Sequence, residues 1–338
     1  MSPRPPLALA FLAARLFAAI PSAGTATALS AADSPPSPTW PAAVREIQYP
    51  SAADQTLQPA LFYAPPGREP RPLLVALHTW SSDYRKATGA PYAEGCLARG
   101  WAFLYPDFRG PNHRPEAGGS ELVLQDVLSA VAFARRSTAI DASRIYLVGN
   151  SGGGHLALLL AGRAPEIWAG VSAWVPITDL RAWYRECRVR QLGYADDIVR
   201  LAGGDPENDP AAARECDRRS PLTHLAAARG LPIDLNAGIH DGHTGSVPIS
   251  HALHAFNVLA APRDHLSPEQ IRHFVEQARV PPELAGATAD GAYGRKPVLF
   301  RRQSGPVRVT IFDGGHEIIS AAAFTWLAHQ RRSGPAAP

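Results

Sequence analysis

The chain contains 338 residues, of which 46% are hydrophobic, so it is long enough to bury one large core or two small ones. Its net charge is only +3 at pH 7, and the basic residues are mostly scattered arginines rather than a stripe with interleaved aromatic side chains. This distribution argues against a nucleic-acid-binding protein, and no internal repeat is visible.

The N-terminal segment, residues 1–28, has the pattern of a secretory signal peptide. Arg4 precedes an apolar run that is too short to span a membrane, and Ala-Thr-Ala at 26–28 offers a cleavage site. Residues 29–40 are rich in Ser, Pro and Ala and are expected to form a flexible lead-in, while 333–338 are expected to be a short tail. We therefore expect an exported protein, periplasmic or secreted, whose mature form has no stable membrane span.

Expected strands and helices alternate along the rest of the chain. Two strands, at 43–49 and 57–64, open the sheet as an antiparallel pair. Further strands are expected at 72–77, 101–105, 144–148, 169–175 and 231–237, with a hairpin at 298–302 and 307–312. Helices are expected at 84–99, 121–136, 155–161, 248–260, 267–279 and 318–331. This alternation predicts an α/β domain over 41–332, with a mostly parallel central sheet flanked by helices.

The most informative stretch is Gly-Asn-Ser-Gly-Gly at 149–153. It follows a β-branched and aromatic run and precedes an Ala- and Leu-rich run, so a strand, a sharp turn and a helix are expected in that order. A nucleophile elbow has this context, because its glycines leave room beside a strained serine and the helix start directs free N–H groups at the attacked atom. Ser151 is therefore the candidate nucleophile, and the alternative is a glycine-rich turn with an idle serine.

A set of motifs makes the chain resemble the α/β-hydrolase fold, most closely the catalytic domain of the prolyl oligopeptidase family and its stand-alone esterase relatives. The motifs are Leu-His-Thr-Trp at 77–80, Pro-Asp-Phe-Arg-Gly at 106–110, the stretch at 149–153, Gly-Ile-His-Asp at 238–241 with Val-Pro at 247–248, and Phe-Asp-Gly-Gly-His-Glu at 312–317. The resemblance covers about 40–331. The chain departs from the family pattern in three ways: it has extra residues between Asp241 and Val247, a helical insertion between Asp241 and His316, and no β-propeller before the domain.

The resemblance and the chain order Ser, Asp, His imply a catalytic triad. A serine hydroxyl needs an adjacent base, and His316 follows the last expected strand on a loop behind two glycines. Asp241 follows another strand and would orient that base, whereas the rival acid Asp234 lies within the strand. The His-Asp-Gly-His sequence at 240–243 leaves a metal site as a minor alternative, but we expect neither a metal nor a cofactor.

The oxyanion of a tetrahedral intermediate needs two N–H donors. The backbone of Gly152, directly after the nucleophile, is one candidate. The resemblance assigns the second to the loop after the third strand, at Thr79 or Trp80, where the family usually has glycines. Trp80 is equally well interpreted as a packed core residue.

Several further residues near these motifs have two interpretations each. Asn150 and Trp174 are expected either to line the acyl or alcohol pocket or to serve only in packing. Asp126 resembles a position that braces the elbow region and is expected to be structural. Asp107 and Arg109 are expected to form a structural ion pair beside the pocket.

Residues 178–230 are expected to form a helical insertion above the carboxyl edge of the sheet. Connections at this edge commonly cover an active site, and Trp183, Tyr184 and Tyr194 would line such a lid. The alternative is an ordinary surface insertion.

Three cysteines are present. Cys187 and Cys216 lie in the same insertion, and in an oxidising compartment they are the expected disulfide pair. Cys96 is expected to be a buried free thiol.

These features predict an exported serine hydrolase that cleaves acyl esters, such as acetyl or feruloyl esters of carbohydrate, through an acyl-Ser151 intermediate. The expected partner is a small-molecule or carbohydrate ester. Ester cleavage is favoured because oligopeptidases of the family use a propeller to admit peptides, and the chain has no room for one ahead of the domain. The alternatives are a serine peptidase acting on short peptides and a non-catalytic binding module on a hydrolase scaffold.

Overall fold

The computed structural model describes Met1 and residues 39–286 and 289–332. The predicted signal peptide, nearly all of the predicted lead-in and the predicted tail lie outside the described residues. Everything below concerns the unit that begins at residue 38.

The described residues form a nine-stranded sheet in the order β1-β2-β4-β3-β5-β6-β7-β9-β8. The strands from β4 to β9 in this order run parallel, while β1, β2 and β8 add antiparallel pairs at the two edges. The mostly parallel sheet expected from the sequence is thus confirmed. The strand bounds are β1 Arg45–Pro50, β2 Leu57–Tyr63, β3 Arg71–Leu77, β4 Ala102–Pro106, β5 Ile140–Asn150, β6 Gly170–Trp174, β7 Ile233–Gly238, β8 Val298–Ser304 and β9 Val307–Phe312.

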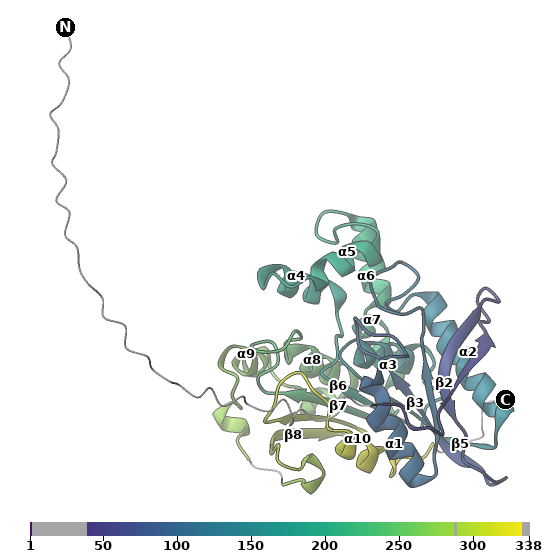
Figure 1. The fold of residues 1–338 in the computed structure, drawn as a ribbon. Coiled ribbons are helices and arrows are strands. Elements are labelled where there is room, and N and C mark those ends of the chain that lie inside the picture. Colours follow the sequence, from purple (N-terminus) through teal and green to yellow (C-terminus); the bar gives the residue numbers. More distant parts are fainter. Residues whose placement is uncertain (2–38, 287–288, 333–338) are drawn as a thin grey trace, which may run out of the picture. The chain divides into compact units, whose positions relative to one another are not determined.

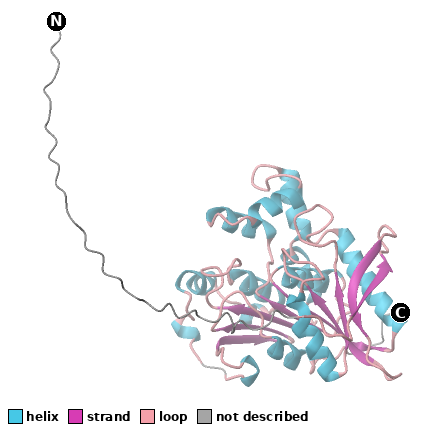
Figure 2. Ribbon diagram, viewed as in Figure 1, coloured by secondary structure: helices cyan, strands magenta, loops and turns pink. Residues whose placement is uncertain are grey.

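Helices cover both faces of this sheet (Figures 1 and 2). Along β3, Leu73, Val75 and Leu77 face one core, whereas Leu74 and Ala76 face the other, because successive side chains of a strand point to opposite sides. Helices α2, α3, α8 and α9 pack on the first core, and α1 and α10 on the second. Their bounds are α1 Ala90–Arg99, α2 Glu121–Ser137, α3 Gly152–Arg163, α8 Ser250–Leu259, α9 Pro268–Gln277 and α10 Ser320–Leu327.

The insertion contains the helices α4 (Leu180–Val189), α5 (Tyr194–Ala202), α6 (Pro210–Arg219) and α7 (Pro221–His224), followed by a 3₁₀ helix at Leu225–Ala228. Helices α4, α5 and α6 lie together beyond one end of the sheet (Figure 1). Asp179 caps α4 by accepting hydrogen bonds from two N–H groups of its first turn. These helices share a separate apolar core that also includes Trp80 and Val247. The insertion therefore packs directly on two loops that follow sheet strands.

The aromatic side chains of the insertion do not line an open lid, so that expectation is wrong. Trp183 and Tyr184 are buried inside the insertion's own core, and the Trp183 ring stacks on Tyr194 with 5.1 Å between centroids. Amphipathic spacing identified the buried face of α4 but could not tell packing within the insertion from contact with a substrate.

The predicted Cys187–Cys216 disulfide is also wrong, since all three cysteines are free and buried. Cys187 and Cys216 pack as small apolar side chains in the core of the insertion. Burial raises the pKa of the Cys187 thiol to about 12 and that of Cys216 to about 11. The thiolate that attacks in disulfide formation is therefore scarce at both positions. Cys96 is a buried thiol, as predicted.

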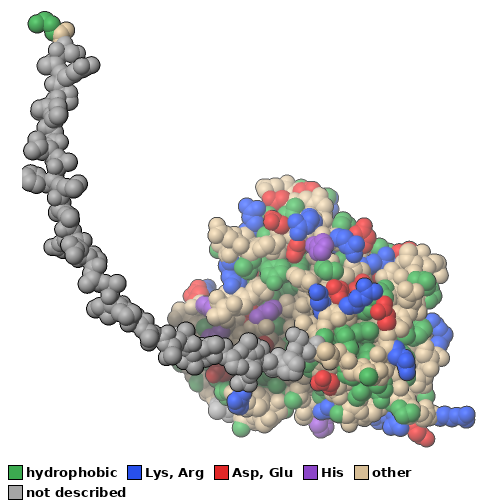
Figure 3. Space-filling view, in the orientation of Figure 1, with side chains coloured by type: hydrophobic (Ala, Val, Ile, Leu, Met, Phe, Trp, Pro, Cys, Tyr) green, Lys and Arg blue, Asp and Glu red, His purple; other side chains and the backbone are tan. Residues whose placement is uncertain are grey.

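No helix among the described residues is long and apolar enough to cross a membrane. On the face drawn in Figure 3, basic side chains are interspersed with acidic ones. This face therefore does not present charge of a single sign.

Candidate active site

Ser151 sits in a strained turn between β5 and α3. Its φ of 57° and ψ of −121° lie outside the regions that a residue with a side chain normally adopts. The strain is held in place because the Ser151 N–H donates to the carbonyl of Trp174 on the neighbouring strand at 2.9 Å. Gly149 and Gly153 pack backbone against backbone, leaving no room for a Cβ on either. The strand, sharp turn and helix predicted around 149–153 are confirmed.

The loop after β3 approaches this turn at one point. A Cβ on Gly152 would lie 2.6 Å from the Cα of Trp80 and even closer to its backbone nitrogen, so the two main chains are in direct contact. No described residue accepts a hydrogen bond from the Trp80 N–H. The three atoms nearest to a Cβ on Gly152 all belong to Trp80 and none to Thr79. Of the two candidates for a second donor, Trp80 is the one placed beside Gly152.

Asp241 and His316 are joined by a hydrogen bond of 2.7 Å between Oδ2 of the carboxylate and Nδ1 of the ring. The other oxygen of Asp241, Oδ1, accepts from the N–H groups of Gly242 at 3.0 Å and Val247 at 3.3 Å. We call residues 242–247 the acid loop. The five residues between Asp241 and Val247 form a turn that wraps around the carboxylate. Asp241 is almost completely buried, which strengthens its interaction with His316.

Gly245 is a residue of the acid loop that sequence reasoning missed. A Cβ at this position would lie 2.6 Å from Cβ of His316 and would overlap Oδ1 of Asp241. The loop therefore packs against both members of the pair. The signal available in the sequence was only the unusual length of the loop, which does not say where its glycine lies.

The alternative roles for neighbouring residues do not fit the geometry. Asp234 is fully buried in β7 and pairs with Arg308 at 2.6 Å, so it is not available to orient His316. His240 pairs with Asp313, and His243 contacts the carbonyl of Val275, so the side chains of 240–243 diverge. Across 39–286 and 289–332, no group of three or more His, Cys, Asp or Glu is arranged to hold a metal ion.

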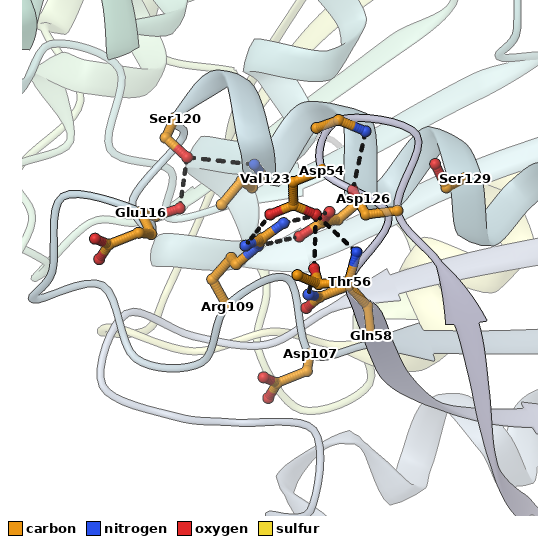
Figure 4. Close-up of polar contacts among 12 residues, drawn as sticks. Asp54, Thr56, Gln58, Asp107, Arg109, Glu116, Ser120, Val123, Asp126 and Ser129 are labelled. Atoms are coloured by element: carbon orange, nitrogen blue, oxygen red, sulfur yellow. Dashed lines mark hydrogen bonds and ion pairs between the residues drawn. The ribbon is translucent and has the colours of Figure 1, made fainter.

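The Asp126 carboxylate is buried in α2 and forms a two-armed ion pair with Arg109 (Figure 4). Nε of Arg109 lies 2.6 Å from Oδ2 and Nη2 lies 3.1 Å from Oδ1. The remaining arm of Arg109 reaches Asp54 at 2.9 Å, which lowers the pKa of the Asp54 carboxyl. The predicted Asp107–Arg109 pair is wrong, because the turn after β4 directs Arg109 towards α2 while Asp107 lies beside the backbone of Tyr84. Asp126 therefore secures this turn.

The two residues considered for the substrate pocket, Trp174 and Asn150, differ in their exposure to solvent. Trp174 is fully buried between Tyr293 and Phe312 and donates its indole N–H to Ser172 at 2.9 Å, so its predicted pocket role is wrong. Asn150, directly before the nucleophile, is partly exposed, and its Oδ1 lies 3.4 Å from the hydroxyl of Tyr92. In a strand that is buried on both faces, nearly every residue is apolar. The sequence therefore does not show which residue is packed in the core and which lines a pocket.

His155 lies one helical turn after Ser151 and is buried against the edge of Trp80. Its Nε2 lies 2.8 Å from the carbonyl of Arg219, and a neutral ring can donate there. Burial lowers the pKa of His155 to about 4. The ring is therefore neutral at physiological pH and links the elbow helix to the insertion.

A cavity of about 330 Å³ opens between α4 and the acid loop. Its apolar lining comes from Val189 of α4, Pro248 and Val275, and Asp241 borders it from the side of the site. The charged side chains around it are mostly engaged, since Arg185 pairs with Glu207 and Glu186 with His251. Such a concave, mainly apolar space beside polar groups is the usual form of a small-molecule site.

The sequence model of the prolyl oligopeptidase family matches residues 94–268, which is more than half of the chain. The chain belongs to the prolyl oligopeptidase family. The matched stretch includes the elbow at 149–153 on which the resemblance rested.

Two kinds of relative accompany the family match. Acylamino-acid-releasing enzyme 1 of Oryza sativa subsp. japonica is 31% identical over 198 residues, covering 54% of this chain and 24% of the rice protein. This chain thus spans about a quarter of the length of that relative. Among solved structures, Pyrococcus horikoshii acylaminoacyl peptidase has a TM-score of 0.51 at 20% identity, covering 64% of this chain and 34% of its own. Oligopeptidase B from Leishmania major has a TM-score of 0.56 at 14% identity, covering 84% and 35%. These structures confirm the predicted α/β-hydrolase fold.

Proposed function

We propose that this chain is a serine peptidase that cleaves short or N-acylated peptides through an acyl-Ser151 intermediate. The observation that carries the proposal is the buried Asp241–His316 hydrogen bond at the sheet edge where the strained Ser151 turn also lies. The rice relative is named an acylamino-acid-releasing enzyme and the Pyrococcus protein an acylaminoacyl peptidase, which supports a peptide over an ester as the substrate. The ester preference expected from the sequence has no such support.

In the proposed reaction the hydroxyl of Ser151 attacks the substrate carbonyl while Nε2 of His316 takes its proton. Asp241 accepts the Nδ1–H of His316, which selects the tautomer with a free Nε2 and stabilises the imidazolium. The negative oxygen of the tetrahedral intermediate receives the N–H groups of Gly152 and Trp80. His316 then donates its proton to the leaving amine, and water hydrolyses the acyl-enzyme by the same steps in reverse.

The cavity between α4 and the acid loop is the proposed position of an apolar group of the substrate. Val189, Pro248 and Val275 offer apolar contact, and the cavity borders Asp241. Ser151 and His316 do not line the cavity, so it is proposed for a group remote from the scissile bond, and its volume of about 330 Å³ suits a single apolar side chain.

The proposal is tested by comparing an amide and an ester that carry the same acyl group, N-acetylalanine p-nitroanilide and N-acetylalanine methyl ester. Both are expected to be hydrolysed, and Ser151→Ala is expected to lose at least about 10³-fold in kcat for both. Ser137→Ala, on the exposed side of α2, is the matched control and should retain full turnover. Hydrolysis of p-nitrophenyl acetate without any turnover of the anilide would favour the esterase, and a folded protein that cleaves none of the three would favour a binding module.

We also propose that the chain is exported after cleavage near Ala28. Arg4, the apolar run that follows it and the Ala-Thr-Ala sequence at 26–28 support this proposal. Mass spectrometry of the protein recovered from a bacterial periplasm or culture medium provides the test. A mature N-terminus at residue 29 is expected, whereas an intact N-terminal segment on protein found only in the cytosol would reject the proposal.

A further inference from the structure

Helix α4 of the insertion contacts both halves of the site through one side chain. Trp183 is fully buried, and its ring lies edge-on to the ring of Trp80 with 4.8 Å between centroids. Its indole N–H donates to the carbonyl of Ser246 in the acid loop at 3.0 Å. Trp183 therefore joins the loop beside Gly152 to the loop that surrounds Asp241.

On the first side, Trp80 is held at three points. Its carbonyl accepts from the N–H of Asn112 at 2.8 Å, and its indole N–H donates to Asp197 of α5 at 3.2 Å. The third contact is the Trp183 ring, which packs edge-to-face with the Trp80 ring, in addition to the His155 ring at 6.0 Å. Because the backbone of Trp80 touches Gly152, a shift of this ring would move the N–H proposed to meet the oxyanion.

On the second side, α4 holds the acid loop at two consecutive carbonyls. Arg190, at the end of α4, donates from Nη2 to Gly245 at 2.7 Å, and Trp183 holds Ser246. The next residue, Val247, donates its N–H to Oδ1 of Asp241, while Gly245 packs against His316. The orientation of the Asp241–His316 pair thus depends on a loop whose carbonyls are fixed by the insertion.

We propose that Trp183 and Arg190 are positioning residues for the hydrolytic reaction, so that α4 sets the geometry of the oxyanion donors and of the triad together. This inference rests on the proposed function for its kinetic consequence, although the contacts that it invokes exist independently of any activity. Neither residue touches the reacting atoms, and both act through main-chain groups of their neighbours.

The first test is Trp183→Phe, which retains an aromatic ring against Trp80 and removes the donor to Ser246. We expect kcat for N-acetylalanine p-nitroanilide to fall by about tenfold with KM changed by less than about twofold, because misplaced catalytic groups lower the rate more than ground-state binding. The affinity for phenylboronic acid, which forms a tetrahedral adduct with an active serine, should fall by a factor similar to that of kcat.

Trp168→Phe is the matched control. Trp168 is equally buried, and its indole N–H likewise donates to a main-chain carbonyl, that of Leu160 at 3.2 Å, away from Ser151, Asp241 and His316. The two substitutions should cost similar stability, but only Trp183→Phe should lower kcat. Equal effects of both substitutions on kcat, or no effect of either, would overturn the proposal.

A readout without turnover separates this inference from the proposed function. The proton on Nδ1 of His316 should give a low-field NMR resonance, assigned by its loss in His316→Ala, that shifts or broadens in Trp183→Phe and not in Trp168→Phe. An unchanged resonance would overturn the positioning role even in a protein without hydrolase activity. If Trp183→Phe does not fold, Arg190→Met provides the same comparison against Arg188→Met, an exposed arginine of the same helix that is not among the residues lining the cavity.

Discussion

At the level of single residues, several buried polar groups in the sheet and helices depend on specific partners. Asp126 depends on Arg109, Asp234 on Arg308, and His155 on the carbonyl of Arg219. A buried charge without its partner is costly, because no nearby opposite charge then offsets the hydration that it loses in the low-dielectric interior. These residues are therefore where substitutions should affect stability most.

Arg109→Met is expected to lower the free energy of unfolding by about 3–5 kcal/mol at pH 7, because it leaves the Asp126 carboxylate buried without an ionic partner. Urea unfolding measures the change. Arg163→Met, which breaks the exposed pair with Glu121, is the control and should cost less than about 1 kcal/mol. Similar losses of unfolding free energy in the two variants would show that the buried Arg109–Asp126 pair stabilises the fold no more than an exposed pair does.

His155 should make stability depend on pH. Its pKa is about 4 in the folded chain against an ordinary value of 6.5, because burial disfavours the charged ring. The unfolded chain therefore binds a proton more readily between these values, and stability is lost as the pH falls through that window, with no effect above about pH 7. Relative to His155→Gln, the unaltered protein should lose about 3 kcal/mol more between pH 7 and 4 in urea unfolding. Parallel stability curves for the two proteins would contradict this account.

At the scale of elements, each functional side chain follows the carboxyl end of a parallel strand. Ser151 follows β5, Asp241 follows β7 and His316 follows β9. The spacing of apolar residues predicted these strands to within a few residues, since a buried strand requires a continuous apolar run. The main differences are at helix ends. The expected helix at 84–99 is divided into a 3₁₀ turn at Ala87–Gly89 and α1, and the last helix is shorter than expected.

Gly152→Ala tests the contact between two of these elements. The added Cβ would overlap the backbone of Trp80, so the loop after β3 must move away from the elbow. We expect kcat to fall by about 10²-fold or more, the loss typical of removing one oxyanion donor. Gly193→Ala is the control, because φ is −60° there and a Cβ would meet no atom within 4 Å. Comparable kcat values for the two alanine variants would argue against Trp80 as the second donor.

At the scale of the whole molecule, the sheet order β5-β6-β7-β9 lets residues far apart in the sequence meet at one edge. Motifs and chain order predicted the fold, the elbow and the pairing of Asp241 with His316, because the connectivity of a parallel sheet constrains where strand ends lie. They did not predict the partner of Arg109, the burial of Trp174 or the free state of Cys187 and Cys216. Each of these features depends on three-dimensional distances between helices, strands and loops. Composition and the spacing of residues along the chain do not give those distances.

The insertion is the part of the molecule about which the sequence was least informative. Its aromatic residues suggested a lid over the substrate, whereas Trp183 and Tyr184 are packed inside it. The contacts of Trp183 with Trp80 and Ser246 join segments from three separate parts of the chain. The spacing of apolar residues reveals that Trp183 lies on the buried face of a helix. It does not reveal that the same side chain also contacts two loops.

Covalent labelling tests whether Ser151 is the nucleophile activated by His316 and Asp241. The folded protein is treated with diisopropyl fluorophosphate, which bonds to an activated serine oxygen with loss of fluoride, and the labelled peptide is sequenced by mass spectrometry. We predict a single label on Ser151 that is absent from Ser151→Ala and reduced by at least about 10³-fold in rate in His316→Ala. A label on another serine, or no label on the folded protein, would contradict the account.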